Sequence, residues 1–131
     1  MGTWSEESVI ESEHTSRFIV QEKWIKRGER RVRHNAFMPN KKGEVSVYRT
    51  EGLDTEEIYE LGRVYMDDIF RKRLLGRAEI IVSDIQKNGL KVQPHPDPHP
   101  RHANIAGWPE DSSKHKAIAL DLAADSALHL I

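Results

Sequence analysis

The chain has 131 residues, the length of one ordinary domain, and a net charge of −1 from 20 basic and 21 acidic residues. It has no cysteine, which excludes disulfides, thiolate metal sites and a cysteine nucleophile. The balanced charge gives no overall field toward nucleic acid or an anionic membrane. We expect a cytoplasmic protein with no membrane contact. Residues 3–13 are too polar for a signal peptide, and no apolar run approaches the roughly 20 residues of a membrane span.

The N-terminal part of the chain predicts a tail followed by a first pair of extended segments. Residues 1–14 are acidic with little to bury, so we expect a flexible tail and assign residues 15–131 to one domain. Arg17–Trp24 alternates loosely between apolar and polar residues and predicts a strand. Val32–Phe37 predicts an extended segment or hairpin partner.

The clearest strand signal is Glu44–Arg49. Successive side chains of a strand point to opposite faces. Val45 and Val47 therefore share one face, and Ser46 and Tyr48 share the other.

The middle of the chain predicts a helix and then an ambiguous apolar run. Asp54 is a typical N-cap, and the apolar residues after it recur at helical spacing toward Arg73. Gly62 weakens the middle of this helix, which either continues or breaks into two pieces. Ala78–Val82 fits a strand or a helix equally, because a short apolar run carries no decisive period.

The C-terminal part is dominated by a His/Pro-rich segment, residues 94–109. Leu90–Gln93 predicts a short strand before it, and the alternating prolines predict a stiff, extended loop. His102–Trp108 predicts a further strand, and Ser113–Leu130 predicts the last helix. Together these elements predict a small α+β domain. We expect about four strands, antiparallel or mixed, with two principal helices on one face of the sheet.

Three histidines of this segment, His95, His99 and His102, are candidate metal ligands, because imidazole is the commonest neutral ligand in proteins. The prolines oppose this interpretation. An extended chain at roughly 3.3 Å per residue places His95 and His99 about 13 Å apart. A solvated surface loop and a single catalytic or ligand-binding histidine remain the alternatives. His102 is the first candidate for such a role because it begins a predicted strand.

A second candidate site combines His102 as acid–base group with Arg101 and Arg49 as anion-binding residues. Asn104, Trp108 and Tyr48 are candidate ligand-binding residues around it. The structural alternative is that Trp108 belongs to the core and that Arg49 forms a salt bridge with Glu51 or Glu57.

A basic stretch is the one local feature suited to phosphate backbones, with Trp24 as a possible stacking ring. Its cationic residues are Lys23, Lys26, Arg27, Arg30, Arg31 and Arg33. A solvated hairpin surface, with Glu22 and Glu29 among the cations, is the alternative interpretation. The sequence contains no glycine-rich phosphate loop, Gly-x-Ser-x-Gly elbow, His-Glu-x-x-His motif or calcium loop, and we predict no cofactor.

The segment Arg-His-Ala-Asn-Ile-Ala-Gly-Trp-Pro, residues 101–109, resembles a motif of small bacterial proteins described as hypothetical. The resemblance extends to His34–Pro39, Val45–Arg49, Glu57–Ile58, Leu61–Gly62 and Gly76–Ala78. It implies that residues 17–130 form one unit and that the source is bacterial. It implies no activity, catalytic residue or partner.

Three functions follow as hypotheses. The first is a binding or accessory protein whose protein partner or small anionic ligand occupies a site near residues 94–109. The second is a small enzyme acting on a phosphoester, nucleotide or nucleic acid through His102. The third is a metal-binding protein using His95, His99 and His102.

Overall fold

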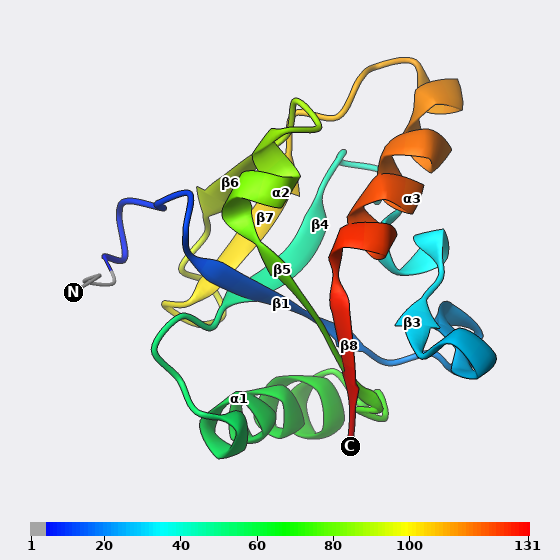
Figure 1. Ribbon diagram of the computed structural model, residues 1–131. Helices are drawn as coiled ribbons and strands as arrows, with labels where there is room; N and C mark the ends of the chain where they lie inside the picture. Colours follow the sequence, from blue (N-terminus) through cyan, green and yellow to red (C-terminus); the bar gives the residue numbers. More distant parts are fainter. Residues whose placement is uncertain (1–4) are drawn as a thin grey trace.

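The computed structural model describes residues 5–131, and a six-stranded antiparallel sheet forms its centre (Figure 1). The spatial order of the strands is β6-β7-β4-β1-β5-β8. The strands are β1 (His14–Ile19), β4 (Val45–Arg49), β5 (Gly76–Ile81), β6 (Lys91–Pro94), β7 (His102–Ala106) and β8 (Ala127–Leu130). The domain is therefore α+β as predicted, but the expectation of about four strands was too low.

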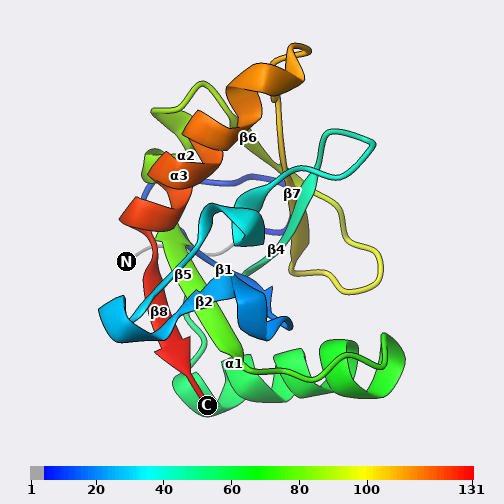
Figure 2. The ribbon, with the colours of Figure 1, turned by 90° about the vertical axis from the view of Figure 1, so that its right-hand side faces the viewer.

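Three α-helices cover the two faces of the sheet (Figures 1 and 2). One face packs against α1 (Thr55–Gly62), which continues as the π-helix η4 (Arg63–Ile69). The other face packs against α2 (Val82–Gln86) and α3 (His115–Asp125). The expectation of two helices on one face is corrected accordingly. None of the helices within residues 5–131 has the length and apolarity of a membrane span.

A small hairpin of β2 (Ile25–Lys26) and β3 (Arg31–Val32) lies beside the main sheet. The 3₁₀ turn η2 (Arg27–Glu29) connects its two strands, while η1 (Glu22–Trp24) precedes the hairpin and η3 (His34–Phe37) follows it. A further turn, η5 (Ser112–Lys114), leads into α3. The predicted extended segment at residues 32–37 is therefore mostly a 3₁₀ turn, and its Phe37 is buried in the core.

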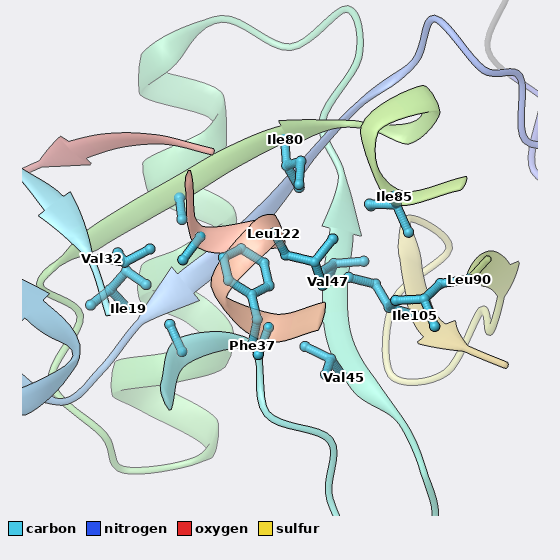
Figure 3. Packing of buried hydrophobic residues seen from close by; sticks show 14 of the residues in the cluster. Ile19, Val32, Phe37, Val45, Val47, Ile80, Ile85, Leu90, Ile105 and Leu122 are labelled. Carbon is cyan, nitrogen blue, oxygen red and sulfur yellow. The ribbon is translucent and has the colours of Figure 1, made fainter. Parts of the chain in front are cut away.

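The larger core lies between the sheet and α3, where alternate strand residues interdigitate with helix side chains (Figure 3). Val45 and Val47 of β4 both point into it, together with Ile80 of β5 and Leu122 of α3. This confirms the predicted face of Val45 and Val47. Burial of these aliphatic side chains is the main stabilising contribution of this layer.

A smaller core on the opposite face holds α1 against β1 and β4. Phe18 and Tyr48 from the strands pack with Ile58 and Leu61 from the helix, and the two rings lie 5.2 Å apart. Ser46 and Tyr48 share this face, as their alternation predicted. The position of α1 therefore fixes one border of the sheet face on which Tyr48 contacts His102 of β7.

The predicted N-cap of α1 is confirmed as a reciprocal capping box. The backbone N–H of Glu57 donates to Asp54 Oδ1 at 2.8 Å, and the Asp54 N–H donates back to Glu57 Oε1 at 3.1 Å. Gly62 ends the α-helical part where the chain approaches β1. A Cβ at Gly62 would lie 2.8 Å from Phe18 Cε1 and 2.9 Å from Leu74 Cδ2. Close packing therefore explains this glycine better than helix weakening does.

The predicted last helix is wrong over its final turn, because residues 127–130 form strand β8. Ser126 is extended, with φ −87° and ψ 156°, and ends α3. The next four residues pair with β5, and Gly76 faces Leu130. A Cβ at Gly76 would clash with the His129 carbonyl, so the glycine permits this close pairing. The run at residues 78–82, which the sequence left open between strand and helix, belongs to strand β5 up to Ile81. Val82 begins α2.

Candidate functional site

The His/Pro-rich segment reverses direction instead of remaining extended. Strands β6 and β7 are antiparallel, with Pro94 opposite Ala103, so the chain must turn within residues 95–101. We name these residues the His/Pro loop; it projects on the side of the sheet away from α3 (Figure 2). The turn brings together His95 and His102, whose rings lie 5.2 Å apart. Proline stiffness alone therefore gave the wrong geometry, because strand pairing at both ends of the loop overrides it.

His102 lies next to Ser46 of the neighbouring strand. Its Nε2 is 2.7 Å from the Ser46 hydroxyl oxygen, and its Nδ1 is 2.9 Å from the carbonyl oxygen of His95. A carbonyl oxygen only accepts hydrogen bonds, so Nδ1 carries the proton and Nε2 accepts from the serine hydroxyl. The backbone thereby orients the imidazole in the tautomer that a general base needs.

The surroundings of His102 oppose a positive charge on its ring. Burial lowers the pKa of His102, whose side chain is only 7% exposed, and the nearby His95 ring lowers it further. The bond to the His95 carbonyl offsets this in part. The ring of His95 faces the Asp97 carbonyl through its Nδ1 at 2.8 Å, and the two Nδ1 atoms are 3.2 Å apart. Because the pKa of His102 is lowered from an ordinary value of about 6.5, its ring is neutral at pH 7.

A cleft of about 470 Å³ separates the His/Pro loop from α1 and η4. We name it the loop cleft. Its loop side is formed by His99 and Arg101, and its helix side includes Leu61, Val64 and Tyr65. Leu53, Glu57 and Glu60 complete the lining. The cleft therefore combines an apolar wall with a polar wall.

The polar wall of the loop cleft has a defined hydrogen-bonding character. The backbone N–H of Arg101 donates to His99 Nδ1 at 3.0 Å, so the proton of a neutral His99 ring is on Nε2. Burial lowers the pKa of His99, and the charge of Arg101 lowers it further. The Tyr65 ring lies 5.6 Å from that of His99, and its hydroxyl donates to the Pro98 carbonyl at 3.1 Å.

Arg101 anchors the His/Pro loop to the end of β4. Its Nη1 donates to the carbonyl oxygens of Arg49 and Glu51, each at 2.9 Å. Burial lowers the pKa of Arg101, as does the neighbouring positive charge of Arg49. Arg101 is thus both a structural residue and part of the loop-cleft wall.

Arg49 is a buried structural residue and does not line the loop cleft. Its side chain is 0% exposed and forms an ion pair with Glu13, with Nε 2.7 Å from Oε1. Its terminal nitrogens also donate to the carbonyls of Glu6 and Ser8, each at 2.9 Å. The predicted salt bridge is therefore present, but with Glu13 rather than Glu51 or Glu57. Arg49, Arg101 and His102 do not share one cleft.

The three candidate ligand-binding residues occupy different surroundings. Tyr48 is buried beside His102, and burial, with Tyr65 nearby, raises the pKa of its hydroxyl to about 12. Asn104 lies opposite Ser46 in the β4–β7 pairing. Trp108 lies beyond the other end of β7, where its Nε1 donates to the Ile105 carbonyl at 3.2 Å and its ring packs on His115.

The basic stretch is interrupted by its own carboxylates. Arg27 pairs with Glu22 at 2.6 Å, while Lys26 and Arg31 share Glu29. Trp24 is buried, with the Arg17 guanidinium 5.0 Å from its ring, so it offers no stacking face to a nucleic acid. Across the part of the chain that the structure describes, no group of three His, Cys, Asp or Glu side chains is placed to hold a metal ion.

Sequence reasoning missed Ser46 and Tyr65 as site residues. Strand alternation put Ser46 on the Tyr48 face, but nothing in the sequence showed that β7 would pair with β4 and bring His102 beside it. Tyr65 falls at helical spacing with the apolar residues of the predicted helix, and nothing in that pattern marks it as a site residue. Among known proteins, no family model, curated protein or solved structure matches the chain.

Proposed function

We propose that the protein is a binding module whose ligand occupies the loop cleft. The observation that carries this proposal is the composition of the cleft, in which His99 and Arg101 face an apolar wall containing Leu61 and Val64. A volume of about 470 Å³ lies within the range of ordinary small-molecule sites. Both polar residues also have lowered pKa values, caused mainly by burial, which is typical of binding sites.

The chemistry of the two walls defines the class of ligand. An arginine side chain has only donors, and the His99 tautomer leaves Nε2–H as its second ring group. The polar wall therefore offers donors, so the ligand must present acceptors to it. The helix wall offers aliphatic side chains and the Tyr65 ring. Its two carboxylates are engaged within the helix, Glu57 by the Asp54 N–H and Glu60 by Arg63. A flat apolar ring with an acceptor-bearing edge, such as an aromatic carboxylate or amide, fits both walls.

Two probe molecules of similar size test this class. Benzoate carries an acceptor edge, whereas benzylammonium carries a donor edge and a positive charge. We expect benzoate to shift the backbone amide signals of Tyr65, His99 and Arg101 in a ¹H–¹⁵N NMR titration, and benzylammonium to leave them unchanged. Equal shifts from both probes, or none from benzoate, would count against the proposal.

A pair of variants locates the binding. Val64→Trp fills the loop cleft from the helix wall, and we expect it to abolish the benzoate shifts. Ile69→Trp is the matched control, because Ile69 lies on the same π-helix, is 53% exposed and does not line the cleft. Benzoate binding that survives Val64→Trp would place the site elsewhere.

A second candidate function is ester hydrolysis, favoured by the Ser46–His102 pair. With His102 neutral and its Nδ1–H held by the His95 carbonyl, Nε2 is able to take the Ser46 proton as the hydroxyl oxygen attacks. The Asn104 side chain stands on the adjacent strand position, on the same face. This function uses the polar sheet surface, whereas the binding function uses the loop cleft.

A fluorophosphonate probe tests the second function directly. The Ser46 oxygen would form a bond to phosphorus, fluoride would leave, and the proton would pass to His102. We expect mass spectrometry to find the adduct on Ser46, with none in Ser46→Ala. Labelling should be at least about a hundredfold slower in His102→Gln, the lower end of what a positioned general base contributes. Ser112→Ala is the control. Labelling at the same rate in Ser46→Ala would reject the hydrolase.

A further inference from the structure

Arg77 is a buried cation whose hydrogen-bonding capacity is not satisfied. It projects from β5, is 6% exposed, and its Nε and Nη1 have no hydrogen-bond partner. Its Nη2 lies 3.6 Å from Glu79 Oε1, and the same carboxylate contacts His14 Nδ1 at 3.2 Å. The Glu79 carboxylate is distant from Arg77 and is shared with His14, so it compensates the Arg77 charge poorly. Buried arginines normally have acceptors for all their N–H groups, so this one requires an explanation.

Arg77 forms part of a cleft of about 720 Å³, which we name the arginine cleft. It lies where β8 runs beside β5 toward α1 (Figure 1), and its helix lining, Thr55 and Tyr59, comes from α1. Its polar lining consists of Arg27, Arg30, Thr55, Tyr59, Arg77 and His129. Three guanidinium groups and an imidazole therefore line one cavity, and none of the described residues in its lining is acidic.

The other two arginines of the arginine cleft differ in whether a carboxylate neutralises their charge. Arg27 pairs with Glu22 at 2.6 Å. No carboxylate of residues 5–131 lies within ion-pair distance of Arg30, which is exposed in a left-handed turn with φ 52°. Tyr59 braces the wall: its ring lies 5.1 Å from the Arg77 guanidinium, and its hydroxyl donates to the His129 carbonyl at 3.2 Å. The cleft thus holds an excess of positive charge on fixed supports.

We infer that the arginine cleft binds the phosphoryl group of a small phosphomonoester. A phosphoryl dianion supplies several acceptor oxygens and the negative charge that Arg30 and Arg77 lack, whereas a carboxylate supplies only two oxygens. The volume exceeds that of a phosphoryl group alone, so the cleft also has room for an attached organic group. This site is separate from the loop cleft, and either can be correct without the other.

The arrangement favours a small molecule over a nucleic acid backbone. The basic stretch divides between two clefts, because Lys26, Arg31 and Arg33 line a different cavity beside α3. A nucleic acid requires a continuous track of phosphate contacts. In the arginine cleft, by contrast, cations from distant parts of the sequence converge on one cavity.

Binding is measured on the full chain by NMR titration with phenyl phosphate, at constant ionic strength maintained with sodium chloride. We expect saturable shifts at residues 27–30, 77 and 128–130. Arg77→Met keeps the apolar stem of the side chain without its charge, and it should raise the dissociation constant about tenfold or more, as expected for loss of charge-assisted hydrogen bonds. Arg31→Met is the matched control and should change it less than about twofold.

A second variant and two further probe molecules test the same phosphoryl site independently of Arg77→Met. Arg30→Met alters an exposed side chain and should weaken phenyl phosphate binding even if Arg77→Met does not fold. Inorganic phosphate should shift the same signals, and more weakly if the cleft also contacts the organic group. Three results would overturn the inference: no saturable shifts, unchanged binding in Arg30→Met, or a ten-residue oligothymidylate that binds more tightly and shifts residues 31–33 instead.

Discussion

At the scale of single residues, the Glu13–Arg49 ion pair makes the clearest stability prediction. Both side chains are buried, so removing the carboxylate leaves an uncompensated guanidinium inside the protein. We expect Glu13→Gln to lower the free energy of unfolding by about 3–5 kcal/mol in urea titrations. Glu11→Gln, at an exposed position on the same segment, is the control. A loss below about 1 kcal/mol, the scale of a surface pair, would show that Arg49 does not depend on Glu13.

His102 makes a pH-dependent prediction. Its pKa is lowered in the folded state, so between that value and about 6.5 the unfolded chain binds more protons than the folded one. The free energy of unfolding therefore rises with pH in this window, and the contribution is lost as pH falls below about 6.5. We expect His102→Gln to flatten the dependence between pH 5 and 7, with His99 supplying a remainder.

Urea titrations at several pH values measure that slope. Ser112→Gln, at an exposed position without a titratable group, is the control and should leave the slope as it is in the unaltered protein. A slope that is the same in His102→Gln and in the control would mean that protonation of His102 is not coupled to unfolding.

The candidate site was only partly predictable from single residues. His102 was identifiable because it begins a predicted strand, away from the prolines. The role of Arg49 was not, since its partner Glu13 lies 36 residues away in a segment that reads as a tail. Arg77 carried no signal either, because burial of an arginine depends on tertiary packing that no local pattern encodes.

At the scale of elements, the junction of α1 with η4 depends on Gly62. A Cβ there would fall within 2.9 Å of Phe18 and Leu74 side-chain atoms. Helix propensity alone favours alanine over glycine by about 1 kcal/mol, so a purely local view predicts stabilisation. We expect the opposite, a loss of about 1–3 kcal/mol in Gly62→Ala, because overpacking forces α1 away from β1.

Gly28→Ala is the matched control for Gly62→Ala. A Cβ at Gly28 meets no atom within 4 Å, and this glycine lies in a short exposed 3₁₀ turn. Thermal unfolding of both variants should show a lower melting temperature only for Gly62→Ala. A higher melting temperature for Gly62→Ala would show that α1 shifts away from Phe18 without loss of stability.

Elements with a strong local signal were predicted well, and those defined by tertiary pairing were not. The capping residue Asp54 and the alternation of β4 are local features, and both are present in the structure. The final four strand residues follow an apolar spacing that also suits a helix. They become β8 because β5 offers an edge with Gly76 at the point of closest approach.

At the scale of the whole molecule, the order of strands predicts how the sheet opens. β1, β4, β5 and β7 each pair on both sides, whereas β6 and β8 are edges with one neighbour. We expect the paired amides of β1 and β4 to exchange hydrogen only through global unfolding, and those of β8 to exchange faster through local opening. Native-state hydrogen exchange by NMR checks this. Equal protection in β8 and β1 would show that the sheet opens as one unit.

The fold class followed from the alternation of strand and helix patterns, but the strand count did not. The short strand β6 was predicted as Leu90–Gln93, within one residue of its bounds. β8 gains its structure from one neighbouring strand, and sequence periodicity over four residues is too short to separate it from the helix before it. The two-sided cover of helices was missed for a related reason. Which face a helix packs on depends on the path of the chain between elements and not on its own apolar pattern.

The contacts of Arg49 also constrain how this chain can diverge in sequence. Loss of Glu13 leaves one buried charge, that of Arg49, without its counter-ion. Loss of Arg49 leaves both the Glu13 carboxylate and the carbonyl oxygens of Ser5, Glu6 and Ser8 without their hydrogen-bond donor. Position 13 should therefore vary only together with position 49. Position 49 should in turn vary only together with the whole segment from residue 5 to residue 13. In related chains, covariation of this pair is expected to be directional, with the arginine as the slower-changing member.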